Sequence, residues 1–172
     1  MATLTPQEKM HFVINLAKKG MKLGELPIAA AIFHGDELLS SAYTTEKQDG
    51  KWLVHAELKA LIDLDEKKIP IKTRKECELF TNLEPCLMCL GTALNSFIGT
   101  VYYAVEAPDD GAVGVVEKHY KSHKINGLPA WHFPDIKVGL LREASIDLFR
   151  EFVEVNEGAA GTDFAKTIAT LK

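Results

Sequence analysis

Two short segments carry residues whose types and spacing suit metal chemistry. The chain has the letters H-A-E at positions 55–57 and P-C-L-M-C at positions 85–89. Two thiolates and one imidazole are ligands that zinc prefers, and three protein ligands leave a fourth tetrahedral position open, as in catalytic rather than structural zinc sites. The sequence therefore predicts a catalytic zinc site whose ligands are His55, Cys86 and Cys89.

The spacing of the two cysteines favours this interpretation. Pro85 is typical of a helix start, so Cys86 and Cys89 are expected in the first turn of a helix. Residues three apart share one helix face. The positive end of the helix dipole favours thiolate over thiol at this position. We therefore expect both sulfurs to be available to one metal ion.

Glu57 lies two positions from His55, near the predicted metal but facing another direction along the helix. A zinc ion lowers the pKa of a bound water from about 15.7 toward 7. A nearby carboxylate can take the proton and pass it to a ring nitrogen, and can then protonate a departing amine. Ammonia leaves poorly unless it is protonated, so one proton-shuttling carboxyl suits hydrolytic deamination.

Two other interpretations of the cysteine pair have to be weighed. A redox pair needs no accompanying H-x-E. A structural zinc site needs a fourth Cys or His ligand. The one spare cysteine, Cys77, precedes an apolar segment and is typical of buried packing. The histidines outside the motif show no ligand spacing to the pair; they are at positions 11, 34, 119, 123 and 132.

The elements that must position these residues follow from the apolar pattern. Helices are expected from Thr5-Pro6 onward and over 55–67, 86–97 and 144–155, and strands over 28–33, 38–43, 78–81, 101–105 and 136–140. The region 108–135 is expected to be long and irregular. After an initial hairpin, strands and helices alternate, which favours an α/β sandwich with a mixed sheet covered on both faces.

Length and charge narrow the function. The 172 residues fit one domain, taken as 1–157, with a possibly helical C-terminal tail over 158–172. The net charge of −4 offers no strong positive field for a polyanion, although Lys118, Lys121 and Lys124 form a candidate basic patch. The sequence shows no apolar signal segment and no run of about 20 apolar residues, so we expect a cytoplasmic protein.

H-x-E with P-C-x-x-C is the signature of zinc nucleobase deaminases. From about Lys9 to Phe152 the chain resembles the cytidine and deoxycytidylate deaminase superfamily, most of all the branch of tRNA adenosine deaminases and bacterial guanine deaminases. G-E-L-P at 24–27 and G-A-V-G at 111–114 add to the resemblance. It implies zinc bound by the three predicted ligands, Glu57 as proton shuttle, a three-layer α/β/α sandwich with a five-stranded mixed sheet, and a homodimer or larger assembly.

The positions at which this sequence differs from that branch are expected to lie around the substrate rather than around the metal. Thr44 stands where the branch carries a base-contacting Asn, Lys51 and Trp52 replace Asp-Pro, and Ala29 replaces a Gly. The candidate substrate-binding residues are two of these differing positions, Thr44 and Trp52, and two residues within the motifs, Ala56 and Pro85. The aromatic segment 131–133 either stacks on a ring or anchors its loop.

Three hypotheses remain. The first is zinc-dependent deamination of a small nucleobase, nucleoside or related amino-heterocycle. The second is tRNA-editing adenosine-to-inosine deamination, which the acidic balance and Thr44 disfavour. The third is a catalytically silent, zinc-stabilised interaction module, which has no need of Glu57.

Overall fold

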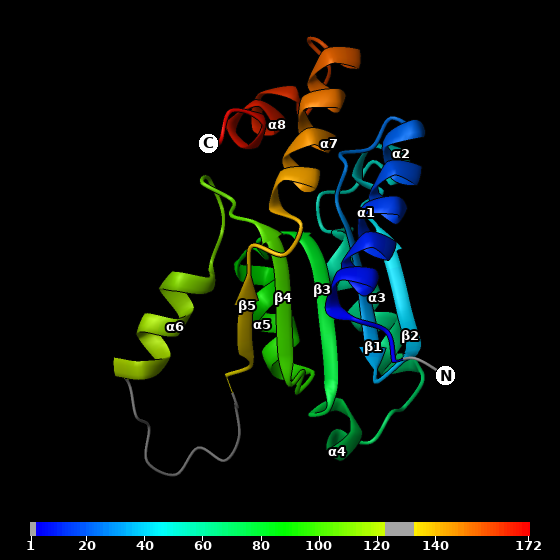
Figure 1. Ribbon diagram of the computed structural model, residues 1–172, viewed down its shortest axis with the longest axis vertical. Coiled ribbons are helices and arrows are strands. Elements are labelled where there is room, and N and C mark those ends of the chain that lie inside the picture. The colour runs from blue at the N-terminus through cyan, green and yellow to red at the C-terminus, as the bar shows by residue number, and fades with distance from the viewer. Residues whose placement is uncertain (1–2, 123–132) are drawn as a thin grey trace.

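The computed structural model describes residues 3–122 and 133–172, which form a five-stranded mixed sheet with strand order β2-β1-β3-β4-β5 (Figure 1). The strands are β1 (Ala29–His34), β2 (Glu37–Tyr43), β3 (Cys77–Leu83), β4 (Thr100–Val105) and β5 (Asp135–Val138). β1 pairs antiparallel with β2 and β3, whereas β3, β4 and β5 run parallel. The predicted mixed sheet is confirmed.

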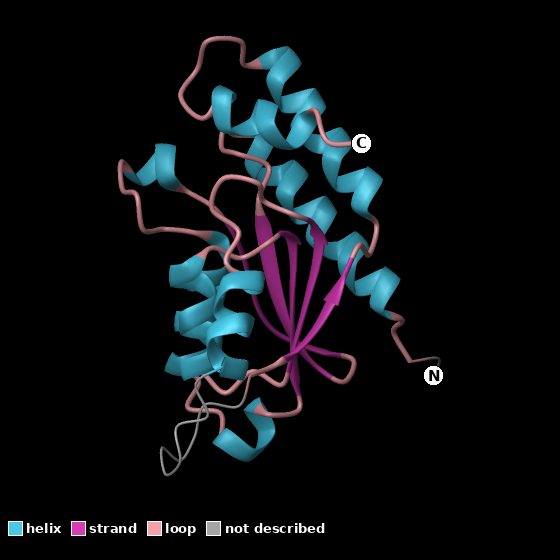
Figure 2. Ribbon diagram, turned by 90° about the vertical axis from the view of Figure 1, so that its left-hand side faces the viewer, coloured by secondary structure: helices cyan, strands magenta, loops and turns pink. Residues whose placement is uncertain are grey.

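Helices cover both faces of the sheet, as Figure 2 shows with the strands seen nearly edge-on. One face carries α1 (Pro6–Lys22), α7 (Arg142–Val155) and α8 (Thr162–Ala169). The other carries α3 (Ala56–Glu66) and α5 (Leu87–Asn95), with α6 (Val113–Ser122) packed against α5. The three-layer architecture expected from the sequence is therefore confirmed.

β1 shows why the sheet must be covered on both sides. Its first five residues are all buried, in contrast to the alternating pattern of a half-exposed strand. Ala29 and Phe33 pack into the core under α1 and α7, whereas Ala30 and Ile32 pack into the core under α3 and α5. The central strand thus joins two hydrophobic cores.

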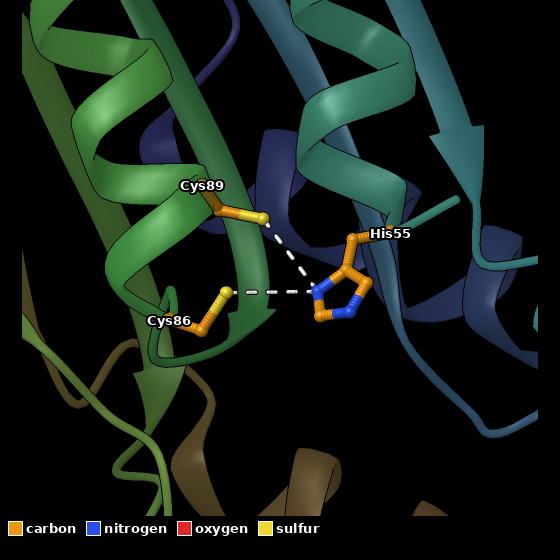
Figure 3. Close-up of side chains that lie close together, drawn as sticks. All are labelled: His55, Cys86 and Cys89. Atoms are coloured by element: carbon orange, nitrogen blue, oxygen red, sulfur yellow. Dashed lines mark hydrogen bonds between the residues drawn. The ribbon is translucent and has the colours of Figure 1, made fainter. Parts of the chain in front are cut away.

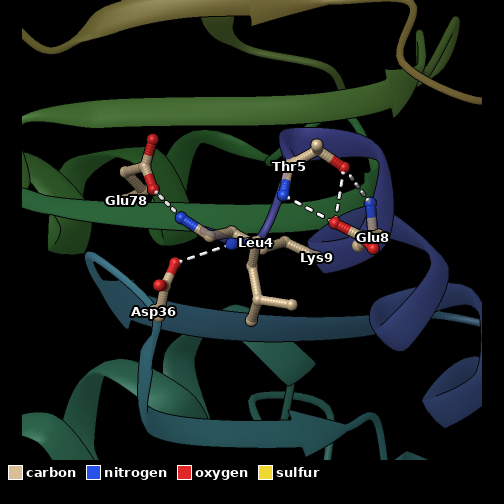
Figure 4. A network of polar contacts seen from close by, with 6 residues as sticks. All are labelled: Leu4, Thr5, Glu8, Lys9, Asp36 and Glu78. Carbon is tan, nitrogen blue, oxygen red and sulfur yellow. Dashed lines mark hydrogen bonds and ion pairs between the residues drawn. The ribbon is translucent and has the colours of Figure 1, made fainter. Parts of the chain in front are cut away.

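The start of α1 is fixed by polar contacts (Figure 4). Thr5 and Glu8 form a capping box, in which each side chain bonds the backbone N–H of the other residue. In the next turn the ammonium of Lys9, which is 5% exposed, donates to Glu78 of β3 at 2.5 Å. The helix start predicted at Thr5-Pro6 is confirmed, and this ion pair ties the helix to the central sheet.

Three helices lie where the sequence pattern predicts no helix. The expectation for 108–135 is wrong over α6, because Val113 packs with Leu90 and Leu94 in a small apolar cluster that gives this segment a buried face. The short helices α2 (Glu46–Asp49) and α4 (Ile71–Arg74) lie in connections for which no helix or strand is predicted. Residues 123–132, including Trp131 and His132, lie outside the described part of the chain.

The segment after α7 returns to the body of the fold. Ala165 and Ile168 of α8 are fully buried in the same core as α1 and α7. The division of the chain at residue 157 stays a prediction. In the described residues, no helix has both the length and the apolar character that a membrane crossing requires.

Candidate functional site

The predicted ligands meet at the N-terminal ends of α3 and α5. His55 is the N-cap of α3, Cys86 is the N-cap of α5, and Cys89 lies in the first turn of α5. The Nδ1 atom of His55 lies 3.6 Å from Sγ of Cys86 and 3.7 Å from Sγ of Cys89 (Figure 3). All three ligand atoms lie within 4.8 Å of one another.

This spacing fits a tetrahedral zinc ion. Bond lengths of about 2.3 Å for Zn–S and about 2.0–2.1 Å for Zn–N place two ligand atoms of such a site about 3.5–3.8 Å apart. The two sulfur–nitrogen distances fall in that range. Within residues 3–122 and 133–172, this is the one group of His, Cys, Asp or Glu side chains close enough to share a metal ion.

The charges of Cys86 and His55 favour a cation between them, whereas a hydrogen bond to Cys86 and burial raise the pKa of the Cys89 thiol. A hydrogen bond from Cys89, helped by one from His55, lowers the pKa of the Cys86 thiol to about 4. Hydrogen bonds to Cys86 and to Glu46 raise the pKa of the His55 imidazole to about 10. A proton on Nδ1 of His55 is thus attracted by the negative charge on Sγ of Cys86. A metal ion at the same place would replace that proton.

Glu57 lies in the first turn of α3 and is 3% exposed. The hydroxyl of Thr81 on β3 donates to its Oε1 atom at 3.1 Å. Burial is the main cause that raises the pKa of Glu57 to about 6. A carboxyl with a pKa near neutrality can both accept and release a proton under ordinary conditions, as a proton shuttle must.

A pocket of about 540 Å³ opens beside these groups. This volume lies in the range typical of small-ligand sites. His55, Glu57 and Cys86 line it at the metal end, and Leu26 and Phe164 contribute apolar surface. Phe164 belongs to α8, so a segment about 75 to 110 residues after the predicted ligands in the sequence forms part of the same pocket.

The residues proposed from sequence for substrate binding take different places. Thr44, Ala56 and Trp52 line the pocket, as does Lys51. Thr44 is buried, and its hydroxyl donates to the carbonyl of Val54 at 3.3 Å. Trp52 is 85% exposed, so it lies at the mouth rather than under the hairpin.

Pro85 is buried next to the ligands and holds the loop that follows β4. Its carbonyl accepts a hydrogen bond from the N–H of Ala112 at 3.1 Å. The carboxylate of Glu84 accepts two more, from the N–H groups of Ala107 and Val113, at 3.2 and 3.0 Å. Gly111 permits this close packing, since a Cβ there would lie 2.4 Å from Oε2 of Glu84.

Sequence reasoning missed three residues of the site. Glu46 contacts the second nitrogen of His55, but it lies in a polar stretch without an apolar period. Glu25 lines the pocket and is 2% exposed. The G-E-L-P segment that contains it was a signal for this residue, although not for its contacts. Nothing in the weak helical pattern of 158–172 points to Phe164.

A sequence-family model, that of the cytidine and deoxycytidylate deaminase zinc-binding region, matches residues 4–105 of this chain. These residues include all three predicted ligands and Glu57. Among curated relatives, the tRNA(Ile)-lysidine synthase of Deinococcus radiodurans is 31% identical over 91% of this chain. This chain spans only 27% of that relative and 26% of the one from Deinococcus deserti.

Two further comparisons cover most of both proteins. The tRNA-specific adenosine deaminase of Bacillus subtilis is 27% identical over 78% of this chain and 80% of its own length. The solved structure of a guanine deaminase from Nitrosomonas europaea aligns with a TM-score of 0.65, at 22% identity, over 88% of this chain and 87% of that one. The structural likeness supports the fold.

Proposed function

Since this chain belongs to the cytidine and deoxycytidylate deaminase family, we propose that it removes the exocyclic amino group of a small nucleobase-like ring by hydrolysis and releases ammonia. The observation that carries this proposal is the tetrahedral spacing of His55, Cys86 and Cys89 beside a buried Glu57, at one end of a pocket of about 540 Å³. Such a hydrolase would act in nucleobase or nucleoside metabolism.

His55, Cys86 and Cys89 would hold the zinc ion, which lowers the pKa of water and thereby supplies a nucleophile at neutral pH. Their arrangement leaves the pocket side open for water and substrate. The thiolates come from the N-terminal turn of α5, where backbone N–H groups stabilise negative sulfur. The two cysteines and the histidine therefore act as ligands and take no part in proton transfer.

Glu57 would move the protons. Its carboxylate takes a proton from water as the oxygen adds to the ring carbon, and delivers it to the neighbouring ring nitrogen. The second proton goes to the amino group, which leaves as ammonia while the carbon–oxygen double bond forms. The hydrogen bond from Thr81 holds one oxygen of this carboxylate in position.

The walls of the pocket favour a small, flat substrate. Leu26, Ile28 and Phe164 supply apolar surface, and Trp52 stands at the mouth. An apolar slot with a few polar groups is the usual form of a site that selects a small ring by stacking and hydrogen bonds. The hydroxyl of Thr44 already donates to the carbonyl of Val54, so it has only acceptor capacity left, where an Asn would offer a donor and an acceptor.

Editing of tRNA is the second candidate, because the Bacillus subtilis relative is a tRNA-specific adenosine deaminase and its length is well covered. The net charge of −4 argues against it. A protein that binds tRNA through several phosphates loses affinity steeply with salt, by about 0.7 to 0.9 log units per contact for each log unit of salt.

One experiment separates the candidates. Zinc-loaded protein is incubated with a panel of bases and nucleosides and, in parallel, with tRNA, while ammonia and inosine are measured. We expect ammonia from at least one small ring, and weak tRNA binding without a steep salt dependence. Inosine in tRNA with no turnover of any small ring would promote the second candidate.

We further propose that the protein is a cytoplasmic homodimer. All three cysteines are free, and thiolate ligands persist best in a reducing compartment. Trp52, Leu53 and Leu87 are each more than 60% exposed, as apolar residues are at surfaces that a partner covers. Sedimentation of the zinc-loaded protein at several concentrations measures its assembly state, and a monomer throughout would refute the dimer.

A further inference from the structure

The imidazole of His55 has contacts on both of its nitrogens. Nδ1 faces the two sulfurs, whereas Nε2 lies 3.0 Å from Oε1 of Glu46. A neutral imidazole carries one N–H donor and one acceptor nitrogen. When Nε2–H donates to the carboxylate of Glu46, the lone pair of Nδ1 is left for a metal ion.

A second carboxylate, that of Glu25, holds the short helix that carries Glu46. Glu25 is 2% exposed, and its two oxygens accept from the N–H groups of Lys47 and Gln48, at 3.0 and 2.6 Å. These donors belong to the first turn of α2, which has only four residues and cannot be stable alone. The buried Glu25 therefore fixes the short helix that carries Glu46.

The residue before α2 is held as well. The hydroxyl of Thr45 donates to the carboxylate of Asp49 at 2.7 Å and accepts from the ammonium of Lys59 at 2.8 Å. Lys59 belongs to α3, the helix that begins just after His55. The segment that presents Glu46 is thus tied both to Glu25 and to the helix of the metal ligand.

We propose that Glu46 is a positioning residue that holds His55 in the tautomer and orientation needed to bind zinc through Nδ1, and that Glu25 acts through it. This inference rests on the zinc site of the proposed function. A carboxylate on the far nitrogen of a ligand histidine fixes its tautomer and raises its basicity, and the loss of such a partner typically costs 10–100-fold in metal affinity.

The test measures zinc affinity rather than activity. Zinc dissociation constants of the full chain are determined by chelator competition for the wild type, Glu46→Gln and Glu46→Ala, with Gln48→Ala as the matched control. Gln48 lies on the same short helix and contributes only its backbone N–H to Glu25. We expect Glu46→Ala to weaken zinc binding about 10–100-fold. The amide of Glu46→Gln can still accept from Nε2–H, so this variant should recover part of the affinity, and Gln48→Ala should match the wild type.

Two further measurements separate positioning from folding. The metal-free variants should unfold at the temperature of metal-free wild type, and cobalt-substituted Glu46→Ala should show a shifted visible absorption spectrum because the imidazole is no longer held in place. As a single substitution, Glu25→Gln should weaken zinc binding. When it is combined with Glu46→Ala, it should cause no further loss of zinc affinity, since Glu25 acts through Glu46.

Zinc affinity of Glu46→Ala within twofold of the wild type, or additive losses from Glu25 and Glu46, would overturn the proposal. Because no substrate is used, this result is distinct from a failure of the proposed function. A wild type that binds zinc tightly but releases no ammonia would refute deamination and leave the role of Glu46 standing.

Discussion

At the scale of single residues, the site places a buried carboxyl group, that of Glu57, next to a pocket that must admit water. Burial keeps its pKa near neutrality, whereas the hydrogen bond from Thr81 holds its orientation. Cys86 is the N-cap of α5, where the positive end of the helix dipole favours thiolate over thiol.

Replacing Glu57 by Gln tests the proton shuttle. The amide keeps the size of the side chain and can still accept from Thr81, but it cannot carry a proton between water and the ring. We expect zinc content to stay near one per chain and turnover to fall at least ~100-fold, given the usual 10²–10⁴ from general acid–base catalysis. Metal analysis and ammonia release measure the two quantities; full turnover in this variant would refute the assigned role.

Counting reactive thiols tests the metal site without any substrate. With zinc bound, Cys86 and Cys89 are ligands, and Cys77 is fully buried. We expect no rapid reaction with a thiol reagent at pH 8 in the zinc-loaded protein. After zinc is removed by a chelator, we expect one rapidly reacting thiol, Cys86, because Cys89 is also fully buried, and three thiols should react after unfolding. Rapid labelling of Cys86 in zinc-loaded protein would contradict its role as a ligand.

The third thiol has its own dependence on pH. Burial raises the pKa of Cys77 from 9.0 to about 11, so the folded protein keeps this proton at a pH where the unfolded chain releases it. Its contribution to stability is therefore fully present below about pH 9 and is lost as the pH rises toward 11. A Cys77→Ala variant should lose less stability than the wild type over that window, as measured by urea unfolding at each pH.

At the scale of elements, the two ligand helices and the loop after β4 must converge. An antiparallel bridge between Cys86 and Gly111 and the bonds accepted by Glu84 join that loop to the start of α5. The loop also leads into α6, which packs on α5. The position of Cys86 thus depends on a segment about 25 residues further along the chain.

Gly111→Ala tests this dependence, with Gly114→Ala as the matched control. A Cβ at position 111 would lie 2.6 Å from the carbonyl oxygen of Ala107 as well as against Glu84, whereas nothing lies within 4 Å of a Cβ at position 114. We expect Gly111→Ala to cost about 1–3 kcal/mol of stability, the usual cost of overpacking, and to weaken zinc binding. Equal unfolding free energies for the two variants would contradict the role of Gly111.

The elements also show what the sequence could and could not predict. The apolar run of β1 predicted a buried strand, and the two motifs predicted three side chains that lie together in the structure, because burial and ligand chemistry leave local patterns. The helix α2 leaves none, since its stability comes from Glu25, about 20 residues earlier. The helical character of α6 likewise depends on burial against α5, which no local period reveals.

At the scale of the whole molecule, the pocket is assembled from distant parts of the chain. Residues from the G-E-L-P segment, from the connection between β2 and α3, and from the turn into α8 all line it. Gly161, with φ of +85°, lies against the side chain of Leu26 and begins α8. The fold therefore brings Phe164 to the pocket through the packing of α8 on α7.

Phe164→Ala tests whether that ring contacts the substrate, with Lys166→Ala on the same helix as control. Stacking of a base on an aromatic ring contributes about 1–3 kcal/mol. We expect Phe164→Ala to raise KM about tenfold with a smaller change in kcat, and to leave zinc affinity unchanged. Steady-state kinetics on the best small ring measures this; unchanged KM would show that α8 closes the pocket without touching substrate.

The composition of the pocket bears on how homologues of this protein could come to differ in substrate. The ligands and Glu57 all lie within residues 4–105, the part shared with a broad family, whereas Phe164 lies outside it. A contact between Phe164 and the substrate would allow substitutions on α8 to change which ring is accepted without any change in His55, Glu57 or the two motif cysteines. Two homologues with identical motifs can therefore differ in substrate, and the last helix is where their sequences should be compared first.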